Sequence, residues 1–489
     1  ATAATRVDED GLVNYAEIVS DTELVTNGNF ATDSDWTTET GWTISGNAAN
    51  FTYSTPSSLI QDLNVTSGLR YLIEYEIVSN SGVSMKGGGG SFFNVGSSIP
   101  STVGLHSFYV IAVNSSGIDF RYLSGSGSLS VTNISVKEAT IDNVPRIDYT
   151  GGGCPHILAE PQRTNLIEYS ESFDSWYAKD YVTVTEDTSE TTSPSGNNTA
   201  SKITINSVST VRRLYEVIST SSGSDYTFTL YAKKGTTDFI RVYFSSSIID
   251  ISFDLTNGTK TVSSGTGSIE SVGNDWYRLQ ATGTSSLTGE VPQIQLSSSA
   301  SVNDYLYIWG AQVEEGSYAT SYIPNFGTSA GVTRNQDIFT RDGIGSLIND
   351  SEGVLFVEAK TTYDSSTSRR ITLSDGSTRN RVSLEFDDSV ENKIKAFITL
   401  NAASEVLEYT ASDLSIFNKI AIKWKANDFA IWLNGSAVVT ETAESRVPTG
   451  MTQLLFDGGN GDNFFYGEVK QLQVYTTALT DAQLTSLTS

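Results

Sequence analysis

One stretch, residues 143–169, constrains the fold of this chain more than any other. It reads NVPRIDYTGGGCPHILAEPQRTNLIEY, with three glycines at 151–153 between Pro145 and Pro155. Proline removes a backbone N–H and fixes φ, and glycine tolerates positive φ, so the stretch predicts neither a helix nor a central strand. It is nevertheless too apolar for a free linker, and we predict an ordered connector packed between two β-modules. Its apolar residues are Val144, Ile147, Tyr149, Ile157, Leu158 and Leu166.

The length and composition predict the class of fold. A chain of 489 residues is too long for one core and indicates about three domains. Hydrophobic residues make up 38%, aromatic residues 10% and charged residues only 18%. Ser, Thr, Gly and Asn are abundant, which is typical of short strands joined by polar turns. We therefore predict an all-β protein of three β-sandwiches in series.

The charge excludes some partners. The net charge is −26, from 56 acidic and 30 basic residues, and the acids are scattered along the chain. Such a chain repels phosphate backbones and anionic lipid surfaces, so we expect neither nucleic acid nor membrane as a partner. No apolar run approaches the ~20 residues of a membrane-spanning helix.

Cys154 is the single cysteine, so no intrachain disulfide is possible. This fits assembly in a reducing cytoplasm. Burial is the usual habit of a free cysteine, and we expect Cys154 to be a small buried residue beside the glycine turn. The sequence begins at Ala1 rather than Met, which indicates a processed start or an N-terminal part that lies outside it.

The first two predicted sandwiches repeat one pattern. LVTNGNF with Trp36 corresponds to LIEYSESF with Trp176, YLIEYEI to YTFTLYA, and LHSFYV to WYRLQA. The phrases keep the same order, which predicts two copies of one fold. Alternating, turn-bounded segments predict strands of the first copy at 58–65, 69–78, 105–113, 118–123 and 128–136.

The C-terminal third carries its own strand pattern. Asn434-Gly435 between two apolar runs predicts a hairpin, and Thr480 with Gln483 has the spacing of a capping box that opens a short helix. Strands are predicted at 353–361, 369–373, 381–387, 393–400, 420–425, 428–433, 436–441 and 468–475.

The connector resembles one that is common in tail-fibre and other adsorption-appendage proteins of bacteriophages, where one module ends PRIDYTGGGCP and the next opens EPQRTNL. In that family a strand like residues 1–20 runs almost directly into the connector. Here residues 21–139 separate the two, so the resemblance implies that the first sandwich is an insertion. That sandwich opens like carbohydrate-binding-module jelly rolls, and the phrases EGVLFVE, FAIWLNG and GEVKQLQVYTTALTDAQL resemble concanavalin-like, laminin-G-type sandwiches.

We therefore predict five parts. They are the N-terminal part of a collar (1–20), an inserted jelly roll (21–140), the Gly/Pro connector (141–164), a second jelly roll (165–325) and a concanavalin/laminin-G-like sandwich with a short C-terminal helix (326–489).

The resemblance also implies a function. It predicts a structural virion appendage, a tail or head fibre, that binds host surface polysaccharide without catalysis. Such a protein is assembled in the host cytoplasm, becomes extracellular with the virion, contacts other virion proteins and forms a homotrimer. Two alternatives stay open, a polysaccharide depolymerase of a tail spike and a secreted bacterial carbohydrate-binding adhesin.

Aromatic side chains are the candidate glycan-binding residues, because sugar rings stack their C–H faces on them. For any single one of them core packing is the more ordinary role, since alternating strands must fill a sandwich. Phe464, Phe465 and Tyr466 are consecutive and cannot all face inward, so at least one is expected at the surface. The candidates are Trp36, Trp42, Tyr75, Phe120, Tyr122, Trp432, Phe464, Phe465 and Tyr466.

No catalytic residue is predicted. Neither His106 nor His156 lies in a nucleophile context, and no zinc or nucleotide motif occurs. The acids Glu385 and Asp387 lack the third acid of a glycosidase strand, and we expect a solvated turn there.

No cofactor is required by the sequence, and calcium is the one candidate ligand. Asp457, Asn460 and Asp462 lie in a Gly-rich loop, and their hard oxygen atoms suit calcium. The same residues favour plain turns, so the loop fits either interpretation.

Overall fold

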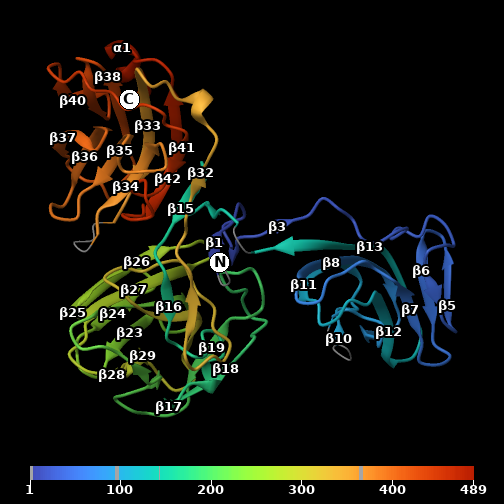
Figure 1. The fold of residues 1–489 in the computed structure, drawn as a ribbon. Helices are drawn as coiled ribbons and strands as arrows, with labels where there is room; N and C mark the ends of the chain where they lie inside the picture. The colour runs from blue at the N-terminus through green and yellow to red at the C-terminus, as the bar shows by residue number, and fades with distance from the viewer. Residues whose placement is uncertain (1–3, 94–97, 142–143, 363–366) are drawn as a thin grey trace. The chain divides into compact units, whose positions relative to one another are not determined.

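The computed structural model describes residues 4–93, 98–141, 144–362 and 367–489 (Figure 1). The described residues form antiparallel β-sandwiches, and their single α-helix is α1 (Asp481–Thr488), so the all-β prediction is confirmed. Two compact units divide the chain. One consists of Ala1–Ala16 with Pro145–Ser489, and the other is Glu17–Val144. None of the described helices has the length and apolar character needed to cross a membrane.

The unit Glu17–Val144 is a β-sandwich of two sheets. The first has the order β10 (Ser98–Ile99), β9 (Val83–Gly87), β12 (Ile118–Gly125), β7 (Ser58–Gln61), β4 (Thr37–Thr38). The second has the order β11 (Gly104–Ile111), β8 (Arg70–Asn80), β13 (Ser128–Thr140), β6 (Ala48–Thr52), β5 (Trp42–Ser45), with β3 (Ile18–Val19) paired to β13. Alternating apolar side chains such as Phe51, Ile73 and Phe120 fill the core between them.

The second sandwich, in the other unit, is also built from two sheets. One has the order β17 (Ala178–Asp180), β20 (Arg213–Tyr215), β29 (Pro292–Leu296), β23 (Phe239–Phe244), β24 (Asp250–Asp254), β25 (Thr259–Ser264). The other has the order β18 (Val182–Thr185), β19 (Ser201–Ile205), β30 (Tyr305–Glu315), β22 (Asp225–Lys234), β27 (Trp276–Thr284), β26 (Thr266–Ser271). Short elements complete it: η1 (Phe173–Ser175) and the pair β21 (Ile218–Ser219) and β28 (Gly289–Glu290).

The predicted repeat is confirmed by the strand order. The series β4, β7, β12, β9, β10 of the first sandwich corresponds to β17, β20, β29, β23, β24 of the second, and β5, β6, β13, β8, β11 corresponds to β18, β19, β30, β22, β27. The aromatic pairs match as well. The rings of Phe30 and Trp36 lie 5.2 Å apart, and those of Phe173 and Trp176 lie 5.3 Å apart.

The N-terminal hairpin covers one outer face of the second sandwich. β1 (Thr5–Val7) pairs with β2 (Val13–Tyr15) across the turn at Gly11, which has a φ of 78°. The Val13 N–H donates to Pro194 O at 2.9 Å. The side chain of Val13 packs in a buried aromatic cluster made of Tyr231, Trp276, Tyr307, Trp309 and Tyr322.

Two strands of the connector, β14 (Ile147–Asp148) and β15 (His156–Ala159), belong to a sheet of the third sandwich. The larger sheet of this sandwich has the order β14, β15, β42 (Gly467–Tyr475), β33 (Glu352–Lys360), β38 (Asn418–Lys425), β39 (Phe429–Leu433), β40 (Ser436–Glu441). The smaller sheet has the order β32 (Thr340–Arg341), β41 (Gln453–Leu455), β34 (Arg369–Ser374), β35 (Arg381–Phe386), β36 (Lys393–Leu400), β37 (Ala403–Thr410). A short η2 (Gly345–Leu347) precedes β33.

The prediction that the connector holds no central strand is therefore wrong. β15 pairs with β14 on one side and with β42 on the other. Pro155 and Pro161 fall just outside the bounds of β15, so none of its own backbone N–H groups is lost to proline. The chain enters the second sandwich after β16 (Arg163–Asn165) and returns from it through β31 (Val332–Arg334). These two strands pair with each other.

Local predictions for the third sandwich are confirmed. Asn434 and Gly435 have φ values of 46° and 88°, as the hairpin between β39 and β40 requires. Thr480 caps α1 in a capping box, with its N–H donating to Gln483 Oε1 at 2.9 Å. The predicted strands all occur, while β32, β37 and β41 were not predicted.

The prediction that Cys154 is buried is wrong, because its side chain is exposed. The three preceding glycines have φ values of 82°, 70° and 82°, and a Cβ added at any of them would meet no atom within 4 Å. The turn therefore stands away from neighbouring chain segments and carries Cys154 with it.

Candidate functional site

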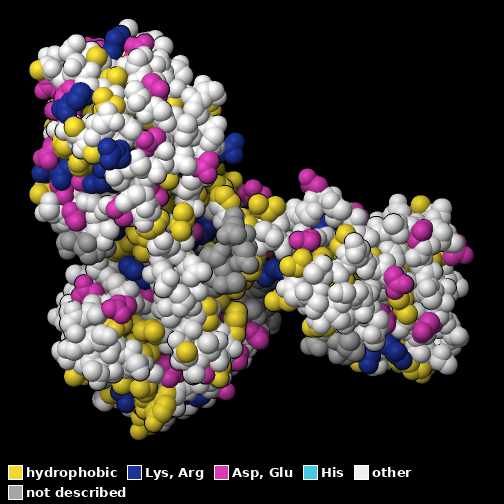
Figure 2. Space-filling model, viewed as in Figure 1, with side chains coloured by type: hydrophobic (Ala, Val, Ile, Leu, Met, Phe, Trp, Pro, Cys, Tyr) yellow, Lys and Arg dark blue, Asp and Glu magenta, His cyan; other side chains and the backbone are white. Residues whose placement is uncertain are grey.

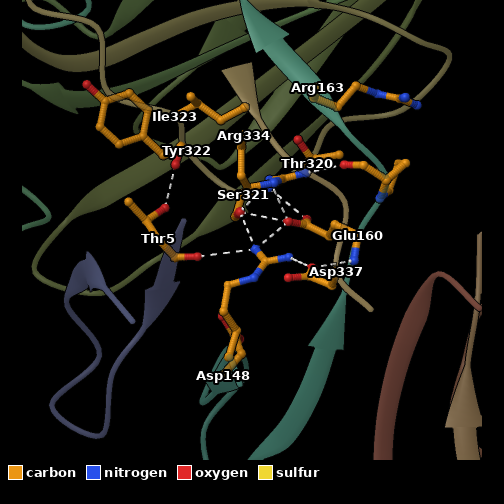
Figure 3. A network of polar contacts seen from close by, with 12 residues as sticks. Thr5, Asp148, Glu160, Arg163, Thr320, Ser321, Tyr322, Ile323, Arg334 and Asp337 are labelled. Carbon is orange, nitrogen blue, oxygen red and sulfur yellow. Dashed lines mark hydrogen bonds and ion pairs between the residues drawn. The ribbon is translucent and has the colours of Figure 1, made fainter. Parts of the chain in front are cut away.

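A buried ion-pair cluster joins the collar, the connector and both ends of the second sandwich (Figure 3). Glu160 Oε2 accepts hydrogen bonds from Arg146 Nη1 at 2.5 Å and from Arg334 Nη1 at 2.7 Å. Arg146 also pairs with Asp337 and donates to Thr5 O at 3.3 Å. We call these residues, Arg146, Glu160, Arg334 and Asp337, the arginine cluster.

The arginine cluster holds its charges by mutual pairing. Burial alone would raise the pKa of Glu160, but Arg334 and Arg146 outweigh it and lower that pKa to about 2. Ser321 donates from its N–H to Glu160 Oε1 at 2.8 Å and from its hydroxyl to Oε2 at 2.7 Å. The carboxylate is thus fully used by donors of the same chain, which makes the cluster a structural joint and not a ligand site.

A second buried ion cluster ties the connector to the third sandwich. His156 Nε2 lies 2.9 Å from Glu468 Oε2 and 3.4 Å from Asp148 Oδ1. Burial alone would lower the pKa of His156, but the two carboxylates outweigh it and raise the pKa to about 9. The imidazole is therefore charged at neutral pH and has no free base for catalysis.

The candidate aromatics of the first sandwich lie mainly in its core. Trp36, Trp42, Tyr75 and Phe120 are buried, and Tyr122 is half-buried against them. A buried ring offers no open face to a sugar, because alternate side chains of each strand must fill the space between the sheets. Only Tyr122 keeps part of its surface accessible.

The candidates of the third sandwich divide in the same way. Trp432 and Phe465 are buried, whereas Phe464 and Tyr466 are half-buried and stack with ring centroids 6.5 Å apart. The three consecutive aromatics do not all face inward, as expected from the strand period.

The loop of Asp457, Asn460 and Asp462 closes as a turn. Asp457 Oδ1 accepts from Gly459 N–H at 2.6 Å, and Asp462 Oδ2 accepts from the Asn460 amide at 3.1 Å. The described residues contain no group of three or more His, Cys, Asp or Glu arranged to hold a metal ion. The loop's own donors use the oxygens proposed for calcium, so the residues fit a turn without a metal, and calcium stays a prediction.

The strongest site candidate lies on the outer face of the sheet β17-β20-β29-β23-β24-β25, and the sequence analysis did not single it out. Leu214, Val242 and Ile294 of these strands point into the core, so their neighbours point outward. We call the outward set the polar–aromatic face. Its members are Asp180, Arg213, Tyr215, Arg241, Tyr243, Asp250, Gln293 and Gln295.

Strand register brings this face together. Arg213 and Arg241 both lie opposite Gln295, one on each side of β29. Tyr215 and Tyr243 both lie opposite Gln293 in the same way. Residues that lie far apart in the chain thereby form two adjacent rows across the sheet.

Hydrogen bonds run through the face without a break. Arg213 donates to Asp180 Oδ2 at 2.9 Å and to Gln293 Oε1 at 3.0 Å. The Gln295 amide donates to Gln293 Oε1 at 2.8 Å, and Arg241 donates to Gln295 Oε1 at 3.0 Å.

Arg241 ends the chain with a bidentate pair to Asp250 at 2.6 and 2.7 Å. These bonds to Asp250 raise the pKa of Arg241. Each arginine of the face thus has its own aspartate, and the face as a whole is neutral.

The tyrosines stand beside the arginines. The guanidinium carbons of Arg213 and Arg241 lie 4.7 and 4.6 Å from the ring centroids of Tyr215 and Tyr243. Tyr177 pairs with Tyr215 at 5.8 Å and is 71% exposed. Figure 2 shows hydrophobic side chains at the surface over the strands labelled β23, β29 and β17 in Figure 1.

A hollow of about 240 Å³ adjoins the face, lined by Phe239, Arg241, Ser252 and Gln295 among others. It is smaller than the ~300–1,000 Å³ pockets that enclose drug-sized ligands. The arrangement therefore offers flat ring faces, fixed hydrogen-bond donors and acceptors, and a small recess, all on a rigid sheet.

The alternation in R-L-Y, I-R-V-Y-F and P-Q-I-Q-L carried a signal for this face, because each phrase places polar or aromatic residues on the side opposite the apolar ones. What the sequence does not state is which strands are neighbours.

No known protein family matches the sequence, and no curated protein matches it. Parts of several solved structures are similar. The CBM40 of the Ruminococcus gnavus IT-sialidase, bound to alpha2,3 sialyllactose, is 17% identical over 31% of this chain and 98% of its own, with a TM-score of 0.26.

Two laminin structures overlap larger parts. Mouse laminin alpha1 domains LG4-5 are 12% identical over 56% of this chain and 92% of their own, with a TM-score of 0.21. The LG1-3 region of the laminin alpha2 chain is 8% identical over 88% and 97%, with a TM-score of 0.22. At these identities and scores the similarity carries no statement about what this chain binds.

Proposed function

We propose that this protein is a non-catalytic glycan-binding appendage, a tail or head fibre of a bacteriophage virion, and that the polar–aromatic face of the second sandwich contacts the host glycan. The virion context rests on the resemblance of the connector and its flanking phrases. The observation that carries the binding function is the unbroken hydrogen-bonded row from Asp180 to Asp250, flanked by Tyr215 and Tyr243.

The face suits a sugar for physical reasons. Tyrosine rings provide the apolar surface on which the C–H face of a pyranose stacks, and such contacts need no charge on the ligand. The amides and guanidinium groups are already oriented by their neighbours, so little side-chain entropy is lost when they bind hydroxyl groups. Because the charges of each Arg–Asp pair balance, we expect the ligand of this face to be a neutral host polysaccharide.

The test is binding of the purified chain to an array of neutral and acidic bacterial surface glycans. Tyr215→Ala and Tyr243→Ala are expected to weaken binding of neutral glycans about fivefold each, since loss of one aromatic contact costs about 1 kcal/mol. Tyr305→Ala is the matched control, because Tyr305 packs on the outer side of the opposite sheet. Unchanged binding in both face variants would assign the glycan to another surface.

Absence of turnover separates the binding function from a depolymerase. Glu385 and Asp387 are not the solvated turn expected from the sequence. Both are buried, with Lys395 Nζ 3.4 Å from Glu385 Oε1 and 2.8 Å from Asp387 Oδ2. Burial alone would raise the pKa of Asp387, but Lys395 and the hydrogen bonds from Ser389 together outweigh it and lower that pKa, whereas a glycosidase acid needs a raised one. Release of reducing sugar from host polysaccharide would contradict the proposal.

A further inference from the structure

The first sandwich presents a different chemistry on the strands that correspond to the polar–aromatic face. β9, β12 and β7 take the places of β23, β29 and β20 in the shared strand order. Across them, Lys86 lies directly opposite Arg121, and Arg121 lies opposite Ser58. Met85 and Phe120, the chain neighbours of the two cations, are core residues, so Lys86 and Arg121 point outward and are half-buried.

The two cations face each other without a counter-charge. No carboxylate of the described residues forms an ion pair with Lys86 or with Arg121, and residues 94–97, which precede β10, read NVGS and contain no acid. Like charges directly opposite each other on neighbouring strands are destabilising. The absence of an acidic partner is notable because the chain has 56 acidic residues and only 30 basic ones.

Two carboxylates next to this pair, those of Glu39 and Asp119, form no ion pair with it. Glu39 Oε2 accepts from Ser58 N–H at 2.8 Å. Asp119, two residues before Arg121, is buried; its Oδ2 accepts from Gly90 N–H at 3.0 Å, and its Oδ1 has no hydrogen-bond partner among the described residues. In the second sandwich the contrast is complete, because Arg213 and Arg241 are each paired with an aspartate.

We propose that Lys86 and Arg121 form a binding site for the anionic group, carboxylate or sulfate, of an acidic glycan. The inference rests on the proposed function and deepens it: two sandwiches of one fold take two classes of sugar, neutral on the second and acidic on the first. A single anion between the two cations removes their repulsion and gains charge-assisted hydrogen bonds from both. Ser98, opposite Lys86, is exposed and supplies a hydroxyl group for the rest of the sugar.

The experiment measures binding of the full chain to polygalacturonate, dextran sulfate and dextran at low and at physiological salt. We expect wild-type protein to bind at least one anionic polymer, with an affinity that falls as salt rises. The double variant Lys86→Gln/Arg121→Gln is expected to lose at least tenfold in that affinity. Polygalacturonate and dextran sulfate distinguish carboxylate from sulfate as the recognised group.

Controls keep the test specific. Lys137→Gln removes one half-buried cation from β13, on the other sheet of the same sandwich, and is expected to bind as wild type does. A loss in Lys137→Gln equal to that in the double variant would overturn the inference, as would full retention of binding in the double variant. Equally tight binding of a single-stranded oligonucleotide would also overturn it, because the site would then recognise any polyanion. Unchanged unfolding midpoints show that the variants are folded.

The outcome separates this inference from the proposed function. If the protein binds neutral host glycans but neither anionic polymer, the acidic site is refuted and the glycan-binding function stands. If no glycan of either class binds, both are refuted.

Discussion

Arg146 and Arg334 donate to one and the same oxygen, Glu160 Oε2. The two arginines are separated by the whole second sandwich in the sequence, and both are fully buried. A buried pair of this kind owes its stability to complete satisfaction of its charges, and removal of one partner leaves an uncompensated ion. The arginine cluster therefore fixes the places where the chain leaves and rejoins the second sandwich.

We predict that Glu160→Gln destabilises the unit Ala1–Ala16 with Pro145–Ser489 by about 3–5 kcal/mol, because two buried guanidinium groups lose their shared carboxylate. Denaturant unfolding followed by tryptophan fluorescence measures this. Asp174→Asn is the control. It breaks the exposed pair with Lys179, 3.1 Å long, and is expected to change stability by less than about 1 kcal/mol. Equal effects of the two substitutions would show that the cluster has no special role.

The His156 site predicts a loss of stability in alkali. The folded-state pKa of about 9 lies above the ordinary value of 6.5, so the protonated imidazole stabilises the fold fully below pH 6.5. This stabilisation is lost as the pH rises from about 6.5 through 9. Unfolding free energies of wild type and His156→Gln, measured between pH 6 and 9.5, should converge toward high pH. The chain has two histidines, so NMR can follow both imidazoles, with His106→Gln for assignment. A His156 titration near pH 6.5 would contradict the prediction.

Deletion of Glu17–Val144 with direct joining of Ala16 to Pro145 should leave a folded protein. Both junction residues belong to the other compact unit, where the Ala16 N–H donates to Ala4 O at 3.0 Å and Arg146 donates to Thr5 O. Inserted domains tolerate such removal when few contacts cross the boundary. Calorimetry should show that the remaining sandwiches unfold at nearly their original temperature. Loss of cooperative unfolding would refute the insertion.

We expect the protein to be a homotrimer, as the resemblance implies. Large apolar side chains are exposed in the connector and in the segment that follows the second sandwich, namely Ile147, Phe326, Ile338 and Leu347. Covering such area is worth about 25 cal/mol per Å². Light scattering should give about three times the chain mass of 52.7 kDa. One species at the chain mass, independent of concentration, would rule the trimer out.

The sequence predicted what depends on short-range pattern. Trp36 and Trp176 marked the repeat because each follows an aromatic partner in the same local phrase. Trp36 donates from Nε1 to Asn27 O at 3.1 Å, and Trp176 donates to Tyr169 O at 2.9 Å. Asn434-Gly435 and Thr480 with Gln483 were recognisable for the same reason, since turn and cap geometry is decided within a few residues.

What the sequence did not predict depends on distant partners. β15 is a central strand only because Ile157 meets Val469, which follows it by more than 300 positions. The polar–aromatic face likewise needs Arg213 and Arg241 to flank Gln295, a register that no local pattern states. Most of the aromatic candidates lie in a core, because a ring that alternates into the core and one that alternates outward look alike until the sheets are placed.

Because paired strands lie far apart in the sequence, the parts of the protein become complete at different times during synthesis. A ribosome completes the first sandwich long before Arg334 emerges, so that sandwich has all its own strands while the arginine cluster still lacks a member. β15 lacks its neighbour β42 for longer still, because β42 is nearly the last segment to be synthesised. The connector therefore spends most of translation with one open edge, and a nascent chain truncated before residue 467 exposes it to pairing with other chains.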